Sequence, residues 1–166
     1  ARGACRGRNV GTQFARGQIL AFPDDNCQYT STTVAEVVSA LAERPGVGIL
    51  SGLLVTESGS PSMLRWPSET TVITRKNVQQ TAIEATMFVR REVFASVGGF
   101  DESIGVGSAG PYQAGEATDL ILRALAAGAT GLFDPAIHIV HEDFREAVEA
   151  NFTQKMRGYG CGLGHV

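Results

Sequence analysis

Apolar and polar residues alternate along the chain in blocks that predict an α/β fold. Short apolar or β-branched runs predict strands at 19–22, 47–55, 70–74, 81–89 and 137–140. Apolar residues at helical spacing predict helices at 8–17, from 33 to the break at Pro45, and at 91–97, 116–127 and 144–157. Strands that alternate with helices indicate a mostly parallel central sheet flanked by helices.

The first predicted strand ends in a cluster of polar side chains. Pro23 cannot donate to a sheet ladder, so the strand ends there, and Asp24, Asp25 and Asn26 follow at its carboxyl end. Open α/β sheets bind ligands at that edge. Adjacent carboxylates repel unless a cation compensates them, which suggests Mg²⁺ or Mn²⁺ with a phosphate-bearing ligand. A turn or helix cap, where Asp and Asn are common, is the alternative.

Composition narrows the class of protein. The chain has 166 residues, 43% hydrophobic and 19% charged, so we expect one folded domain over 1–166. The net charge of -3 gives no reason to expect nucleic acid as a partner. Three cysteines without a C-x-x-C pair favour a reducing compartment. No apolar run is long enough to span a bilayer. We therefore expect the protein to be cytoplasmic, either free or at the inner face of the membrane.

Three further features of the sequence bear on a binding site. The glycine-rich stretch 104–115 is long for a connection, which is typical of a mobile loop over a site. His138 and His141 suggest zinc, but residues three apart on a strand face opposite sides of the sheet, which argues against it. Trp66 is either a platform for a sugar ring or a core residue under a loop.

Three separated segments resemble those of family 2 glycosyltransferases. The first is Asn-Val-Gly at 9–11 with Ala-Arg-Gly-Gln-Ile-Leu-Ala-Phe-Pro-Asp-Asp-Asn-Cys at 15–27, similar to the family's helix, strand and DxD-type segment. The second is Phe-Val-Arg-Arg-Glu-Val-Phe at 88–94 with Val-Gly-Gly-Phe-Asp-Glu at 97–102. The third is Gly-Glu-Ala-Thr-Asp-Leu at 115–120, continuing to Arg123. Together they follow the family's order over nearly the whole chain.

The resemblance implies a Rossmann-like GT-A fold that transfers a sugar from a nucleotide-diphosphate sugar to a glycan or lipid-linked acceptor. Asp24 would face the donor's ribose and Asp25 a Mg²⁺ or Mn²⁺ ion, with Asn26 as an accessory ligand. Arg8 would reach the nucleotide, or else be an ordinary exposed helix residue. His141 would contact the metal or diphosphate, or else be a solvated strand end.

The same resemblance places the catalytic acids at the start of the helix 116–127. An inverting transferase, which we expect here, needs a carboxylate to take the proton of the acceptor hydroxyl. Glu116 and Asp119 are three residues apart and share one side of a helix. We expect Glu116 to be the base or acceptor anchor, with Asp119 second. Alternatively, Glu116 partners the helix dipole and Asp119 is a structural hydrogen-bonder.

Rival functions remain open at this stage. Many family members have Asp where this chain has Ala117, which keeps a non-catalytic sugar-nucleotide or glycan-binding module in view. A nucleotidyltransferase would need a glycine-rich basic phosphate loop, which these residues lack. By resemblance, the family's first strand–helix–strand would precede Ala1, and we expect little transfer without that nucleotide-binding segment. The oligomeric state is open, with a homodimer as one expectation.

Overall fold

The computed structural model describes residues 3–142 and 152–166. Within them a six-stranded sheet has the order β1-β5-β3-β6-β2, and β4 also pairs with β6. The strands are β1 (Ile19–Ala21), β2 (Cys27–Tyr29), β3 (Val47–Thr56), β4 (Thr71–Ile73), β5 (Met87–Arg90) and β6 (Thr130–His141). The helices are α1 (Ala4–Phe14), α2 (Thr33–Glu43), α3 (Val78–Thr81), α4 (Arg91–Ser96), α5 (Glu116–Ala126) and α6 (Phe152–His165), with a 3₁₀ turn η1 (Glu84–Thr86).

The sheet is mixed, so the prediction of a mostly parallel sheet is wrong. Among the described strands only β3 and β6 run parallel, while β1–β5, β3–β5, β2–β6 and β4–β6 are antiparallel. Residue patterns could not reveal this, because a strand shows the same alternation whichever way it runs. The connections decide direction. The short segment 22–26, which holds the predicted acids, joins β1 and β2 at opposite ends of the strand order.

Strand β6 is longer than the sequence predicts. The prediction of a turn at Asp134–Pro135 is wrong, because β6 continues through both residues. The register of β6 against β3 nevertheless jumps there: Gly52 faces Asp134, and the next residue, Leu53, faces His138. Pro135 therefore lies in an irregularity of the ladder, where a residue without an N–H can be accommodated.

The predicted helices form, with differences in their bounds, whereas α3 and η1 were not predicted. The prediction of a strand at 81–89 is wrong before Met87, because η1 occupies 84–86 and the strand β5 begins only at Met87. Helix α1 begins at Ala4, earlier than predicted. Helix α6 continues through the glycine-rich segment at 158–164, which the sequence predicts to be a helix end. The predicted helix start near Phe144 lies outside the described residues. The loop at 104–115 contains no helix or strand, as predicted.

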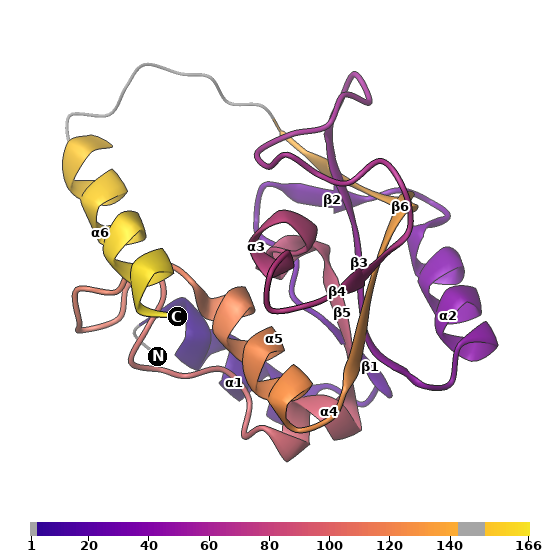
Figure 1. Ribbon diagram of the computed structural model, residues 1–166, viewed down its shortest axis with the longest axis horizontal. Coiled ribbons are helices and arrows are strands. Elements are labelled where there is room, and N and C mark those ends of the chain that lie inside the picture. Colours follow the sequence, from indigo (N-terminus) through magenta and orange to yellow (C-terminus); the bar gives the residue numbers. More distant parts are fainter. Residues whose placement is uncertain (1–2, 143–151) are drawn as a thin grey trace.

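Helices α2 and α5 lie on opposite faces of the sheet (Figure 1), and an apolar layer separates each helix from the sheet. Adjacent strand residues belong to different layers: Ile49 packs with the α5 residues Leu120 and Ile121, whereas Leu50 packs with the α2 residue Leu41. Successive side chains of a strand point to opposite faces, so β3 contributes to both layers. Each fully buried aliphatic side chain of this kind stabilises the fold by about 1.5–3 kcal/mol.

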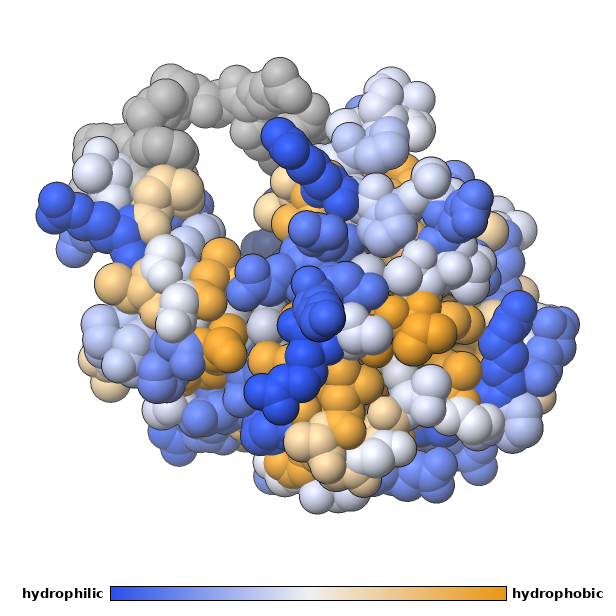
Figure 2. All heavy atoms as spheres, in the orientation of Figure 1, coloured by the Kyte–Doolittle hydropathy of each residue, from blue (hydrophilic) through white to orange (hydrophobic). Residues whose placement is uncertain are grey.

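The surface over α5 and α6 carries hydrophobic and hydrophilic residues side by side (Figure 2). Across 3–142 and 152–166, no helix has the length and hydrophobicity needed to traverse a bilayer.

Glycines in β3 allow neighbouring segments to approach closely. A Cβ on Gly52 would lie 2.5 Å from the carbonyl oxygen of Ile137, and one on Gly48 would lie 2.7 Å from a methyl group of Val93. A glycine inside a strand predicts either a kink or a close backbone approach, and both positions show a close approach.

We expect Gly52→Ala to destabilise the protein by about 1–3 kcal/mol, because a backbone carbonyl cannot move aside as a flexible side chain can. Gly46→Ala is the matched control, since its Cβ would have no atom within 4 Å. It should change the free energy of unfolding by less than about 1 kcal/mol. Urea unfolding of both variants measures the difference, and equal stabilities would contradict the packing argument.

Candidate functional site

Arg8 on α1 contacts acids from two distant parts of the chain. Its Nη2 donates to Asp24 Oδ1 at 2.8 Å, and its Nη1 lies 3.7 Å from Glu116 Oε1. The Arg8 side chain is 18% exposed and the Glu116 side chain only 6%. Arg8 Nη1 is buried and has no hydrogen-bond partner within the described residues. The structure therefore brings together three residues that the sequence proposes for one site.

Asn9, next to Arg8, fixes α1 against the turn at 97–102. Its Nδ2 donates to the carbonyl of Phe100 and its Oδ1 accepts the Phe100 N–H, both at 2.9 Å. The Phe100 ring also lies 5.7 Å from the Arg8 guanidinium carbon. A Cβ on Gly99 would lie 2.8 Å from Asn9 Oδ1, and Gly99 has a φ of +77°. The first and second motifs thus meet through hydrogen bonds between the Asn9 side chain and the backbone of Phe100.

Asn26 and His141 come together at the other end of the acidic turn. Cys27 faces His141 in the β2–β6 ladder, and the N–H of Glu142 donates to the carbonyl of Asn26 at 3.0 Å. Asn26 Nδ2 and His141 Nε2 are 3.1 Å apart. His141 Nδ1 is buried without a hydrogen-bond partner among the described residues. Asp25 is exposed between Asp24 and this pair.

The donor atoms of this turn fit a divalent ion only in part. Among the described residues, no group of three or more His, Cys, Asp and Glu side chains could hold a metal ion. Asp25, Asn26 and His141 offer a carboxylate, an amide and an imidazole. Mg²⁺ commonly takes one or two protein carboxylates and completes its shell with phosphate oxygens and water. Within the described residues these donors therefore form no closed protein cage for an ion.

The carboxylate of Glu116 is enclosed by the loop at 104–115. Its Oε1 accepts the N–H of Val106 at 3.2 Å. A Cβ on Gly105 would lie 2.6 Å from the same oxygen, so only glycine leaves room there. Gly115, with a φ of +101°, turns the chain into α5 and directs its first residue inward. Glu116 is 5% exposed as a result.

Glu84 belongs to this cluster, and sequence reasoning missed it. Its Oε1 accepts the N–H of Ala117 at 2.6 Å, which satisfies a free amide in the first turn of α5. Burial raises the pKa of Glu84, and the charge of Glu116 raises it further. The available signal was an acid flanked by Ile83 and Ala85, directly before a buried strand.

Asp119 lies on the same helix but has a different partner. Its Oδ2 accepts hydrogen bonds from Arg123 Nε at 2.9 Å and from Arg123 Nη2. Arg123 also donates to the carbonyls of Val97 and Gly99. Asp119 therefore holds the arginine that secures the 97–99 turn, and no ion pair joins it to Arg8.

Trp66 and His138 contact residues of the fold rather than the candidate site. The Trp66 ring stacks on Phe133 with centroids 5.6 Å apart, and its Nε1 donates to the carbonyl of Ser62. His138 is exposed on β6, while its backbone carbonyl accepts the hydroxyl of Thr33. The core interpretation thus describes Trp66 better than the sugar platform.

No family model matches the sequence, and no curated protein matches it either. Among solved structures, the chain is similar to the mannosyltransferase PcManGT from Pyrobaculum calidifontis in complex with GDP-Man and Mn²⁺. That match has 16% identity and a TM-score of 0.59 over 89% of this chain and 38% of the other. A second similar structure is GalNAc-T7 with UDP, GalNAc and Mn²⁺, at 17% identity and a TM-score of 0.64 over 96% and 34%.

At these identities the likeness concerns the fold. The chain has a mixed α/β fold that resembles those of glycosyltransferases, which confirms the fold prediction at this level. It spans 38% and 34% of the two solved chains. Membership of family 2 stays a prediction.

We expect Glu84→Gln to change how stability depends on pH. A carboxyl whose pKa is raised in the folded state contributes stability below about pH 4.3, and this contribution is lost as pH rises through the folded value. Gln keeps an oxygen for the Ala117 N–H but does not titrate. The variant should therefore gain stability relative to wild type as pH rises from 4 to 8.

Urea unfolding across this range tests the expectation. Glu92→Gln, at an exposed position on α4, is the control. A stability difference for Glu84→Gln that does not vary with pH would show that burial leaves this carboxyl unperturbed.

We expect Asp119→Asn to lower the free energy of unfolding by about 1–3 kcal/mol, because the half-buried Arg123 loses its charged partner. Glu102→Gln is the control. Its contact with Arg6 is exposed and 3.9 Å long, and the amide oxygen of Gln can still accept the hydrogen bond from Asn9 Nδ2, so the cost should stay below about 0.5 kcal/mol. If the variant instead keeps its stability but loses all turnover, Asp119 is the carboxylate that acts as the base.

Proposed function

We propose that this chain is part of a metal-assisted, inverting glycosyltransferase that moves a sugar from a nucleotide-diphosphate sugar to an acceptor hydroxyl. The observation that carries the proposal is the position of Arg8, in contact with both Asp24 and Glu116. The acid expected at the donor and the acid expected at the acceptor thus lie on either side of one guanidinium. The likeness to solved glycosyltransferases, crystallised with GDP-Man or UDP and with Mn²⁺, supports it.

The donor's nucleotide and diphosphate would bind along the acidic turn. Asp24 would accept a hydrogen bond from a ribose hydroxyl, and Arg8 would face the diphosphate, where an arginine binds phosphate oxygens well. Arg8 Nη1, which lies 3.7 Å from Glu116, has no hydrogen-bond partner among the described residues, and a phosphate oxygen of the donor would supply one.

A divalent ion would be held by Asp25, with Asn26 and His141 as further contacts. When bound, Mg²⁺ or Mn²⁺ would neutralise charge that develops on the departing diphosphate. The unpartnered Nδ1 of His141 is compatible with a polar ligand at this position.

Glu116 would act as the base. As the acceptor oxygen bonds to the anomeric carbon, the bond from that carbon to the diphosphate oxygen breaks, and the hydroxyl proton passes to Glu116. Arg8 Nη1 lies 3.7 Å from this carboxylate. The hydrogen bond from the Val106 amide orients the same oxygen. Asp119 remains the second candidate, although its Oδ2 is bound to Arg123.

A second candidate function is a sugar-nucleotide or glycan-binding module without transfer. Two observations favour it: Glu116 is only 5% exposed, and the following residue is Ala117 rather than an acid. A buried carboxylate can serve a structural purpose as the partner of Arg8. The two candidates differ in turnover, which one substitution can test.

We expect one nucleotide sugar of a panel to raise the melting temperature of the intact protein, and to do so more strongly with Mn²⁺ or Mg²⁺ present. In the same assay Asp25→Asn should abolish the metal-dependent part. The intact protein is used because the chain spans only part of the solved structures. Failure of every nucleotide sugar to stabilise it would contradict the transferase and the sugar-nucleotide-binding module, and would leave only a glycan-binding module.

We expect Glu116→Gln to lower turnover at least about 100-fold while donor stabilisation persists, since loss of a general base commonly costs 10²–10⁴-fold. Glu57→Gln, an exposed acid distant in sequence, is the matched control. If the wild type binds donor and hydrolyses or transfers nothing, the binding module is the correct candidate. Full turnover by Glu116→Gln would assign the base elsewhere.

A further inference from the structure

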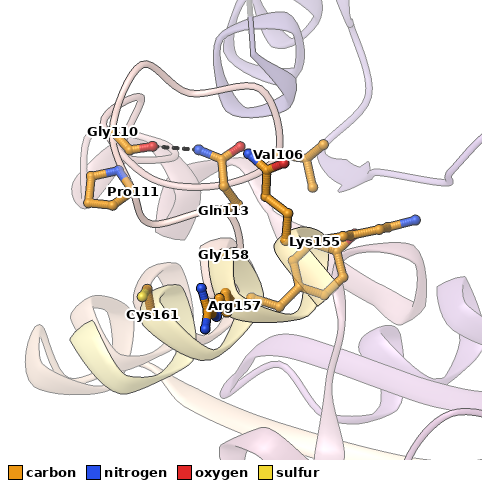
Figure 3. A pocket seen from close by; sticks show the side chains of 10 residues that line it. Val106, Gly110, Pro111, Gln113, Lys155, Arg157, Gly158 and Cys161 are labelled. Atoms are coloured by element: carbon orange, nitrogen blue, oxygen red, sulfur yellow. Dashed lines mark hydrogen bonds between the residues drawn. The ribbon is translucent and has the colours of Figure 1, made fainter. Parts of the chain in front are cut away.

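A groove of about 740 Å³ lies between α6 and the loop at 104–115 (Figure 3). This volume is in the range of small-molecule sites. The loop contributes one wall and α6 the other. The lining residues are Val106, Gly110, Pro111, Gln113, Gln154, Lys155, Arg157, Gly158, Tyr159 and Cys161.

Both walls are held in place by specific contacts. The Gln113 side chain donates to the carbonyl of Gly110 at 2.6 Å, and its Oε1 accepts the N–H of Gly107 (Figure 3). The Gln113 N–H donates to the carbonyl of Gly158 at 3.1 Å. A Cβ on Gly162 would lie 2.2 Å from the Ala114 carbonyl oxygen, so the helix rests directly on the loop backbone. The groove is therefore a built feature of the fold.

The groove adjoins the carboxylate proposed as the base. Val106 lines it, and the backbone N–H of the same residue donates to Glu116 Oε1 at 3.2 Å. A molecule in the groove therefore contacts the residue that orients Glu116. The same oxygen lies 3.7 Å from Arg8, which also binds Asp24 of the proposed donor site.

The charge of the groove differs from that of the whole chain. The chain has a net charge of -3, yet the lining contains Lys155 and Arg157 and no carboxylate. The two cations are two positions apart on α6, so they lie on either flank of Gly158 rather than on one face (Figure 3). A half-buried aromatic residue, Tyr159, also lines the groove, and Lys155 Nζ lies 6.0 Å from its ring centroid.

We infer that this groove binds the acceptor as an oligosaccharide that carries negative charge on more than one sugar. An aromatic ring packs on the C–H face of a pyranose, and the flanking cations attract carboxylate or phosphate groups. Because the cations are on separate flanks, a ligand with spaced charges fits better than a single phosphate. The assignment of this ligand as an acceptor rests on the proposed function, whereas its binding does not.

Cys161 provides a direct readout of occupancy. It is exposed and lines the groove, whereas Cys5 is buried and its pKa is raised to about 12 by burial and by Glu116. Cys27 lies next to the acidic turn and reports on the donor side. Alkylation by iodoacetamide, followed by mass spectrometry, gives separate rates for Cys161 and Cys27.

The probes are hyaluronan tetrasaccharide, which carries two carboxylates, neutral chitotetraose and glucose 6-phosphate. We expect the hyaluronan probe to slow alkylation of Cys161 most and to leave Cys27 unchanged. Lys155→Gln and Arg157→Gln should each weaken this protection about three- to fivefold, and Lys76→Gln should not. Raising salt from 50 to 500 mM should weaken it as well. The control Lys76 is exposed and does not line this groove.

Three results would overturn the inference: equal protection by chitotetraose, protection of Cys27 instead of Cys161, or no protection by any probe at millimolar concentration. Stronger protection by glucose 6-phosphate would reject a ligand with spaced charges. The melting-temperature assay with nucleotide sugars separates this test from the proposed function. Groove protection without donor stabilisation would leave a glycan-binding groove and reject the transferase, and the reverse result would reject the groove alone.

Discussion

A single guanidinium, that of Arg8, organises the centre of this protein. Asp24 and Glu116 belong to different elements, and each would be costly to place near the other without a cation between them. Arg8 lies 2.8 Å from one carboxylate and 3.7 Å from the other. The rest of the fold keeps this arginine in place, because a few ångströms of displacement would leave a largely buried carboxylate unpaired.

Backbone contacts provide that precision. Asn9 binds both polar groups of Phe100, and the N–H of Ala4 donates to the carbonyl of Val106 at 2.8 Å. Helix α1 is therefore tied at two points to the chain around α5. Glycines at the tightest approaches, Gly99 and Gly105, allow these contacts, since a Cβ at either would meet Asn9 or Glu116.

The arrangement separates two chemically different surfaces around Glu116. Arg8 links Glu116 to the turn that contains Asp24, Asp25 and Asn26, where the proposed donor and its cation would bind. Val106 links Glu116 to the groove along α6, whose lining has two cations and no acid. In the proposed reaction the donor and the acceptor would meet at this carboxylate. Glu84, whose pKa is raised by burial and by Glu116, accepts a hydrogen bond from Ala117 in the first turn of α5.

Local pattern alone determined much of this architecture. Apolar periodicity placed most of the helices and strands, and Pro23 placed Asp24 and Asp25 at a strand end, because both signals depend on neighbouring residues. Local pattern did not determine strand direction, because β1 and β5 show the same residue pattern in either orientation. The sheet predicted to be mostly parallel is mixed.

Only the tertiary structure decided which acids share a site. The sequence ranked Glu116 before Asp119 but placed both at one site, because helix spacing puts them on one side. In the folded protein Asp119 pairs with Arg123, and Glu116 pairs with Arg8. Glu84, from a segment with no motif, contacts the same end of α5 through the N–H of Ala117. The physical reason is that ion pairs and burial depend on distances between residues tens of positions apart, which no local pattern encodes.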